Sequence, residues 1–199
     1  MKIVIIKYNA GNIRSVEFAL QRLGIEPEIT ADPEKLKAAD KVIFPGVGEA
    51  STTMKYLREH KLDQLIVSLK QPVLGICLGL QLMCKHSEEG DTTCLGIFEE
   101  EVKRFQVPKG EESLYKIPQM GWNTLTGLKT NLFNPSLENQ YVYFVHSYYA
   151  SIGPHTIATT QYSQAFSSAL HKDNFYATQF HPEKSGTVGA KILKNFIDL

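Results

Sequence analysis

Cys77 has the clearest capacity for covalent chemistry in this sequence, because a glycine lies two residues away on each side of it. It belongs to Pro72-Val-Leu-Gly-Ile-Cys-Leu-Gly-Leu-Gln81, where an apolar run that predicts a buried strand meets residues that favour a helix. A sharp strand-to-helix turn crowds Cβ atoms, and Gly75 and Gly79 have none. The pattern is typical of a nucleophile elbow with cysteine in place of serine, although a single cysteine in an apolar run is about as often a core residue.

A second group that can do chemistry is His181-Pro182-Glu183, which follows the strand predicted from Phe175 to Phe180. In an extended chain, residues two apart point to the same side, so Glu183 can bind the imidazole of His181 and fix its tautomer. His181 can then take the proton of Cys77 and return it to a leaving amine. A lone histidine is more often structural, but a glycine-flanked cysteine together with this group favours a Cys-His-Glu site. His146 is a weaker candidate base, because no acid lies two residues beyond it.

Acyl transfer also needs hydrogen-bond donors for the negative oxygen that forms on the substrate. The backbone N–H of Leu78, the residue after the nucleophile, is the natural first donor. The turn Gly46-Val47-Gly48 can supply the second, and we assign it to Val47. The same turn also reads as an ordinary strand-to-helix connection, which would need glycine in any case.

The elements that must position these residues alternate between strand and helix in the first half of the chain. Strands are predicted at 3–6, 26–30, 41–44 and 73–76, and helices at 13–23, 33–39, from 51 through 66, and from 78 onward. This order predicts an α/β fold with a mostly parallel central sheet and helices on both faces, whose loops at the carboxyl ends of the strands meet. Asn12 is predicted to be the N-cap of the first helix.

The second half of the chain predicts short strands at 96–105, 122–125, 141–145, 157–160, 165–171 and 175–180, followed by a helix from 185 to 199. Many of these strands are expected to pair antiparallel, as an addition to the parallel core. The sequence shows neither repeats nor a linker. We therefore expect residues 1–199 to form a single domain.

The composition excludes several functional classes. Hydrophobic residues make up 43% of the chain, and 21 basic residues balance 21 acidic ones, which argues against disorder and against a nucleic-acid surface. The apolar run at the start is too short for a signal peptide or a membrane span, so a cytoplasmic protein is expected. Three cysteines at uneven spacing predict reduced thiols and no metal site.

The elbow and the His181-Pro-Glu183 group together resemble the class I, or triad, glutamine amidotransferases, which hydrolyse the side-chain amide of glutamine and pass the ammonia to a synthase. Within that class, four further stretches are similar to the glutaminase subunits of imidazole glycerol phosphate synthase. They are Asn9-Ala-Gly-Asn12, Pro45-Gly-Val-Gly48, Pro118-Gln-Met-Gly-Trp-Asn123 and Tyr143-Phe-Val-His-Ser-Tyr-Tyr149. Two departures are visible: Ala10 stands where proline is frequent, and Glu49-Ala50 stands where His-Phe is common.

The resemblance implies that Cys77 is the nucleophile, His181 the general base and acid, and Glu183 its orienting partner. It also implies a set of residues that hold L-glutamine: Gly46, Gly48, Gln81, Ser147 and Tyr148. Gln81 lies one helical turn past the nucleophile and can face the same pocket, although a surface glutamine is an equal reading of it. Ser147 and Tyr148 can equally be ordinary strand residues.

The resemblance further implies a heterodimer with a cyclase subunit, a (β/α)₈ barrel that uses the ammonia to make imidazole glycerol phosphate and AICAR, and it implies no cofactor. Trp122 suits such an interface, although the only tryptophan of a chain is as often in its core, and Asn12 can also face the partner. Three alternatives remain open: a glutaminase for another synthase, including a sugar-amidating paralogue; a catalytically silent binding subunit; and a thiol peptidase, which the Trp122 and Ser147 stretches do not support.

Overall fold

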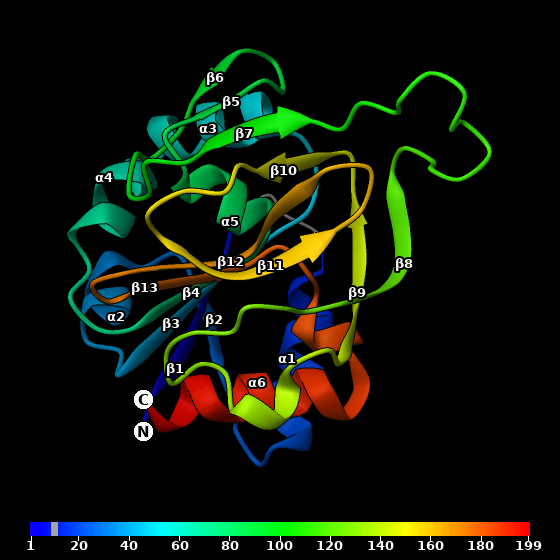
Figure 1. Cartoon of the computed structure of the whole chain (residues 1–199). Helices are drawn as coiled ribbons and strands as arrows, with labels where there is room; N and C mark the ends of the chain where they lie inside the picture. Colours follow the sequence, from blue (N-terminus) through cyan, green and yellow to red (C-terminus); the bar gives the residue numbers. More distant parts are fainter. Residues whose placement is uncertain (9–11) are drawn as a thin grey trace.

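The structure is a computed structural model that describes residues 1–8 and 12–199. Its main feature is a large sheet with the strand order β2-β1-β3-β4-β13-β12-β10-β7-β5-β6, in which β11 also pairs with β12 (Figure 1). The parallel half of this sheet consists of β1 (Ile3–Ile6), β2 (Glu28–Thr30), β3 (Lys41–Gly46), β4 (Val73–Cys77) and β13 (Phe175–Thr178).

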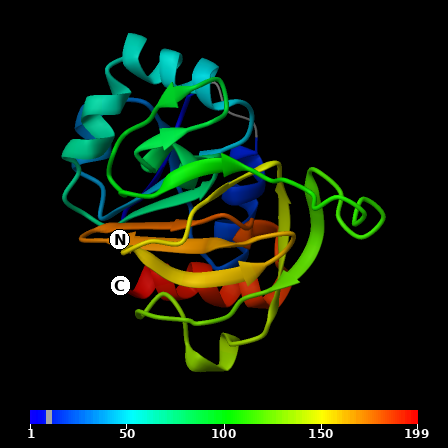
Figure 2. The same ribbon diagram turned by 45° about the horizontal axis from the view of Figure 1, so that its top comes forward.

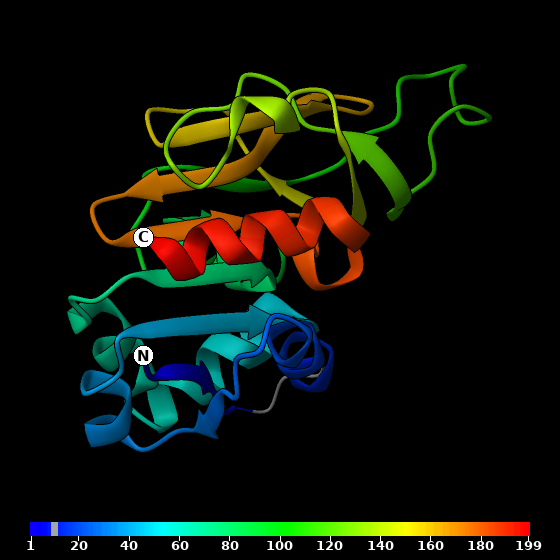
Figure 3. The same ribbon diagram turned by 90° about the horizontal axis from the view of Figure 1, so that it is seen from below.

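The parallel strands are buried on both faces, which is why their sequences are apolar without alternation. In β1, Ile3 and Ile5 belong to the core on one face of the sheet, whereas Val4 and Ile6 belong to the core on the other. One face is covered by α1 (Ile13–Arg22) and α6 (Gly186–Asp198), and Figure 3 shows α6 lying along it. The other face is covered by α2 (Pro33–Lys37), α3 (Ala50–Glu59), α4 (Leu62–Ser68) and α5 (Leu78–Met83).

The remaining strands extend the sheet beyond β13, mostly by antiparallel pairing. They are β5 (His86–Ser87), β6 (Thr92–Thr93), β7 (Glu101–Arg104), β10 (Tyr148–Ala150), β11 (Thr156–Gln161) and β12 (Ala165–Lys172). A separate antiparallel pair is formed by β8 (Gln119–Thr124) and β9 (Tyr141–His146). The segment that connects these two strands carries the 3₁₀ turn η1 (Pro135–Leu137). The segment between β7 and β8 projects away from the body of the molecule (Figure 2).

The predicted fold class, a mostly parallel sheet with helices on both faces and an antiparallel addition, is confirmed. Several details were wrong. The helix expected from 51 through 66 is two helices, because Lys61 takes a left-handed conformation between α3 and α4. The strand expected at 96–105 is restricted to β7, and the short strands β5, β6 and β10 were not predicted.

Two differences affect the site directly. The strand expected to end at Phe44 continues through Gly46, whose register partner in β4 is Cys77. The last strand, β13, joins the parallel core beside β4, with Thr178 opposite Ile76. Both differences bring chain segments to the same edge of the sheet. Ala10, one of the two departures from the family pattern, lies outside the described residues.

Candidate active site

Cys77 lies at the sharp turn between β4 and α5, as the glycine pattern predicted. Its backbone has φ 54° and ψ −107°, a conformation that non-glycine residues rarely adopt and that the surrounding structure must enforce. A Cβ at Gly79 would lie 2.1 Å from the carbonyl oxygen of Phe44, and one at Gly75 would lie 2.9 Å from the Met83 sulfur. Gly79 is therefore needed because α5 packs directly on the backbone of β3, and Gly75 because the same helix also lies close over β4.

His181 and Glu183 meet, but not through the extended geometry expected from the sequence. Pro182–Lys184 forms a 3₁₀ turn, η2, and within it His181 Nδ1 lies 2.7 Å from Glu183 Oε1. Their side chains are only 1% and 0% exposed. Since Nδ1 is bound by the carboxylate, Nε2 is the nitrogen available for proton transfer, and it has no hydrogen-bond partner among the described residues.

Asn12 contacts this pair directly. Asn12 is the N-cap residue of α1, as predicted, with φ 71°, and its carbonyl accepts the first bonds of the helix, but among the described residues its side chain makes no capping hydrogen bond. Its Nδ2 instead donates to Glu183 Oε1 and lies 3.4 Å from His181 Nδ1. The amide and the imidazole thus meet at the same carboxylate oxygen, and Asn12 helps to fix the position of Glu183.

The electrostatics differ sharply between the two histidines near the sulfur. Burial lowers the pKa of His181, but the adjacent Cys77 sulfur and the Glu183 carboxylate outweigh burial and raise this pKa to about 10. Burial lowers the pKa of His146 to about 4, against the smaller opposing effect of its hydrogen bond to the Tyr148 carbonyl. Of these two histidines, only His181 has an environment that favours its protonated form, which is the form that can protonate a leaving amine.

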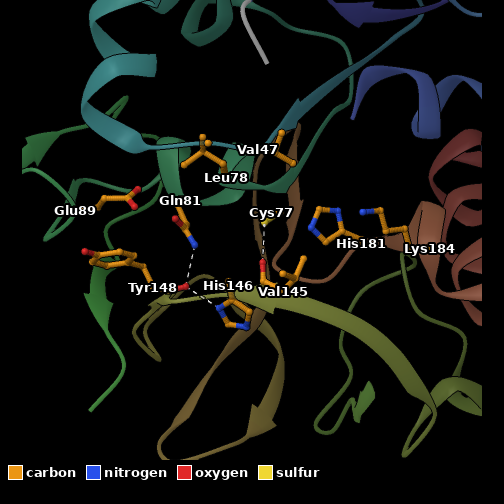
Figure 4. Close-up of a pocket in the computed structure, with 11 residues that line it drawn as sticks. Val47, Cys77, Leu78, Gln81, Glu89, Val145, His146, Tyr148, His181 and Lys184 are labelled. Atoms are coloured by element: carbon orange, nitrogen blue, oxygen red, sulfur yellow. Dashed lines mark hydrogen bonds between the residues drawn. The ribbon is translucent and has the colours of Figure 1, made fainter. Parts of the chain in front are cut away.

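A pocket of about 260 Å³ opens in front of the sulfur. It is lined by Val47, Gly48, Cys77, Leu78, Gln81, Glu89, Val145, His146, Tyr148, His181 and Lys184 (Figure 4). Figure 4 shows His181 on one side of Cys77, and Gln81, Tyr148 and Glu89 toward the other end. A small polar molecule with a reactive group at one end and charged groups at the other fits this arrangement.

Most of the predicted site residues converge on this pocket. Gln81 is only 4% exposed, and its Nε2 donates to the Tyr148 carbonyl at 2.8 Å, so it is not a surface glutamine. Gly46 and Ser147 are not among the described residues that line the pocket, although Gly46 pairs with Cys77 and Ser147 precedes Tyr148. Trp122 is 56% exposed on β8 rather than part of the core.

Sequence reasoning missed two charged residues of the pocket. Glu89 Oε2 accepts a hydrogen bond of 2.8 Å from the N–H of Ala50, which holds its carboxylate at the start of α3. Burial raises the pKa of Glu89, and the neighbouring Glu49 raises it further. Lys184 lies on the 3₁₀ turn and was detectable from its position directly after Glu183, whereas Glu89 lies in a polar stretch with no pattern that marks it.

In the part of the chain that the structure describes, no cluster of three or more histidine, cysteine or acidic side chains is arranged to hold a metal ion. The described helices are all too short or too polar to cross a membrane.

A cysteine at a strand-to-helix turn, facing a buried histidine–carboxylate pair on a parallel sheet, defines an enzyme site for thiol-dependent acyl transfer. The glutamine amidotransferase class-I family matches residues 4–199, and the chain belongs to this family.

Among curated proteins, the chain is similar to imidazole glycerol phosphate synthase subunit HisH of Bacteroides fragilis strain YCH46, with 62% identity over 199 residues that cover 100% of both chains. It is 60% identical, again over 100% of both chains, to the protein of that name from Bacteroides thetaiotaomicron. Among solved structures, PurLQS from Thermotoga maritima has a TM-score of 0.71 and 15% identity, covering 99% of this chain and 97% of that one. The structural likeness concerns the fold alone.

Proposed function

We propose that this chain hydrolyses the side-chain amide of L-glutamine through a thioester on Cys77 and supplies the ammonia to the cyclase subunit of imidazole glycerol phosphate synthase. The observation that carries the proposal is the convergence of the strained Cys77 turn and the buried His181–Glu183 pair on one pocket. The curated relatives that bear the name of this synthase's subunit, at 60–62% identity over their full length, support the choice of partner.

In the first half-reaction, the Cys77 sulfur attacks the carbonyl carbon of the glutamine amide, and the carbonyl electron pair moves to oxygen. The raised pKa of His181 keeps its imidazole protonated beside the thiolate, so Nε2–H can protonate the departing nitrogen. The C–N bond then breaks, ammonia leaves, and a thioester remains on Cys77. Glu183 holds the imidazole through Nδ1, so that Nε2 faces the reacting atoms.

In the second half-reaction, His181 removes a proton from water, and the resulting hydroxide attacks the thioester. The C–S bond breaks, the electron pair returns to sulfur, and glutamate leaves. In both halves the negative oxygen needs donors, for which we assign the backbone N–H groups of Leu78 and Val47. Support for Val47 comes from the pairing of Gly46 with Cys77, which places the next residue beside the nucleophile.

The remaining pocket residues suit the amino-acid end of glutamine. Gln81 donates through Nε2 to the protein, which leaves its Oε1 as an acceptor for the substrate ammonium. Glu89 is the only carboxylate among the described lining residues, and it adds a negative charge at the same end (Figure 4). Gly48, Ser147 and Tyr148 contribute backbone groups near the substrate carboxylate, and Gly46 keeps the turn close to the sulfur.

The partner is proposed to dock on a β8 patch, defined here by the exposed side chains of Met120 and Trp122 on β8 and Tyr141 on β9. The patch is close to the catalytic residues, because β8 pairs with β9 and β9 contacts both His181 and Cys77. The Tyr143 carbonyl of β9 accepts the N–H of His181 at 2.9 Å, and the Val145 carbonyl lies 4.0 Å from the Cys77 sulfur. A partner on this patch can therefore influence the site, and we expect weak activity alone and stimulation by the cyclase. Asn12, which bonds to Glu183, is the second proposed link to the partner.

The route needs only proton transfers and one bond to sulfur, so we propose that it runs without a cofactor. We also propose that residues 1–199 act as a single domain, which the continuous sheet supports. A cytoplasmic location is proposed because all three cysteines are free thiols.

The activity is tested by measuring glutamate release from glutamine with the cyclase present. Cys77→Ala is expected to abolish it, whereas Cys94→Ala, a buried thiol outside the pocket, is expected to leave it unchanged. Undiminished glutamate release by Cys77→Ala would end the proposal.

The partner surface is tested by titrating the cyclase against Trp122→Ala. Truncating a central aromatic side chain of an interface typically costs about 2 kcal/mol or more of binding free energy. The dissociation constant for the cyclase is therefore expected to rise about 30-fold. Phe18→Ala is the matched control, since Phe18 is also an exposed aromatic but lies on α1. Equal effects of the two substitutions would show that the β8 patch is not the docking surface.

A further inference from the structure

Gln179 is a buried side chain next to the reacting atoms that has no part in the mechanism above. It lies between the end of β13 and His181 and is completely buried. Its backbone N–H donates to the Ser168 carbonyl at 2.9 Å, which continues the pairing of β13 with β12 by one residue. The backbone therefore fixes the direction of the side chain, which is toward α5 and the nucleophile.

The Gln179 carboxamide bridges two groups of the site. Its Nε2 lies 3.7 Å from the Cys77 sulfur, and its Oε1 accepts a hydrogen bond of 3.1 Å from Gln81 Nε2. Gln81 Nε2 also donates to the Tyr148 carbonyl at 2.8 Å. A chain of hydrogen bonds therefore runs from the backbone of β10 through two amides to the sulfur.

The orientation of both amides follows from this chain. A backbone carbonyl can only accept, so the Gln81 group that faces Tyr148 must be its NH₂. The same NH₂ faces Gln179, whose group there must be its oxygen. The remaining end of the Gln179 amide, which faces the sulfur, is then an N–H donor. Turning either amide over would set two donors or two acceptors against each other in a buried place.

We propose that Gln179 is a further catalytic residue, whose side-chain N–H donates a hydrogen bond to the Cys77 sulfur and favours its anionic form. A thiolate accepts a hydrogen bond far better than a thiol or a thioester does, so the contact strengthens whenever negative charge is on sulfur. It acts before the attack on the amide and again when the C–S bond of the thioester breaks and the electron pair returns to sulfur. Through Gln81, the same amide fixes the group that receives the substrate ammonium.

The inference rests on the proposed thioester route, but its test does not need glutamine. The probe is iodoacetamide, and the measured quantity is the second-order rate of Cys77 alkylation between pH 5 and pH 9, followed by mass spectrometry of the peptide that carries Cys77. Alkylation reports the anionic sulfur directly.

Two variants remove the donor in different ways. Gln179→Met keeps the approximate length and has no N–H, and Gln179→Glu keeps the shape and replaces the donor with an acceptor or a negative charge. The groups that face the sulfur from the surrounding elements stay unchanged in both: Tyr8, Glu89, His146, His181 and Lys184. Ser168→Ala is the control for packing, because its hydroxyl is buried and has no hydrogen-bond partner among the described residues.

In Gln179→Met, the alkylation rate is expected to rise at a higher pH than in the wild type. At neutral pH the rate should be about tenfold lower, which corresponds to the loss of one hydrogen bond to a charged group. Gln179→Glu is expected to move the profile further in the same direction, and Ser168→Ala to leave it in place. Each variant is first checked for cooperative unfolding. If a folded Gln179 variant shows the same pH profile of Cys77 alkylation as the wild type, the inference is overturned. If instead the wild type releases no glutamate while Gln179→Met still moves the alkylation profile, the proposed function fails and the contact stands.

Discussion

The catalytic turn is held from behind by a helix, and this predicts that Gly189→Ala damages catalysis from outside the pocket. Gly189 lies on α6, where an added Cβ would be 1.9 Å from the carbonyl oxygen of Pro182 and 2.8 Å from its carbonyl carbon. Both atoms are backbone, so neither can swing aside. The turn that carries His181 and Glu183, or the helix, must then move by about 1.5 Å before the Cβ at 1.9 Å reaches the 3.4 Å of an ordinary contact.

A displacement of this size is enough to separate proton donor and acceptor. Misplacing a catalytic group by about 1 Å typically costs roughly 100-fold in rate, so we expect kcat to fall by about two orders of magnitude. Overpacking a core costs about 1–3 kcal/mol of unfolding free energy. For a domain of this size, a loss of about 2 kcal/mol lowers Tm by roughly 4–8 °C. The protein should therefore remain folded in an assay at 25 °C.

The assay is steady-state glutamate release at saturating cyclase, together with a thermal unfolding curve for each protein. Lys191→Ala, an exposed change on the same helix, is the control and should match the wild type in both. A Gly189→Ala protein with lowered Tm and wild-type kcat would refute the reasoning, because it would show that the position of the turn does not depend on α6.

Three further changes test the charges of the site. Glu183→Gln weakens a buried, charge-assisted hydrogen bond of 2.7 Å to His181, worth roughly 1.5–3 kcal/mol, so kcat should fall by about 10- to 150-fold with little change in KM; an unchanged kcat would contradict the role of the carboxylate. Glu89→Gln should raise KM for glutamine, because it removes a negative charge from the pocket. Burial raises the pKa of Glu89, so the wild-type carboxylate is neutralised as the pH is lowered and the wild-type KM should increase. The variant should lack this pH dependence, and a wild-type KM that does not change with pH would contradict the role of Glu89. Burial lowers the pKa of His146 from 6.5 to about 4 in the folded protein. Between these pH values the unfolded state binds a proton that the folded state does not, so acid favours unfolding. The free energy of unfolding should therefore fall by up to roughly 3 kcal/mol as the pH drops from 6.5 to 4. His146→Phe should remove that part of the acid sensitivity in urea unfolding measured across this range, and an equal pH slope in both proteins would show that His146 is not its source.

The features that could be predicted from the sequence are those fixed by residues close together along the chain. The Cys77 turn is one, since Gly75 and Gly79 on either side of it allow the close approach of α5 to β4 and β3. The pairing of His181 with Glu183 is another, because Pro182 limits the backbone between them. The predicted extended geometry was wrong, however, since a 3₁₀ turn rather than a strand brings the two side chains together, and that turn packs against α6, the helix that follows it directly.

The features that could not be predicted depend on contacts between distant segments. Gln81 reads equally as a surface residue until Tyr148 of β10, a strand that was not predicted, is placed over it. The carboxylate of Glu89 is held at the pocket by the N–H of Ala50 of α3, a residue 39 positions earlier in the chain. Asn12 is the N-cap residue of α1 as its type suggests, but its side-chain amide donates to Glu183, a residue far along the chain, and this contact has no local sequence signal.

The central claim is that the sulfur of Cys77 is the nucleophile of a glutamine pocket and is activated by His181. The most direct test is labelling by 6-diazo-5-oxo-L-norleucine, an electrophilic analogue of glutamine, in the presence of the cyclase, with the adduct located by mass spectrometry. The account predicts one adduct per chain, on Cys77 and not on Cys84 or Cys94, slowed by glutamine and slowed at least 100-fold in His181→Ala. An adduct on another cysteine, or labelling of Cys77 that neither glutamine nor the loss of His181 affects, would contradict it.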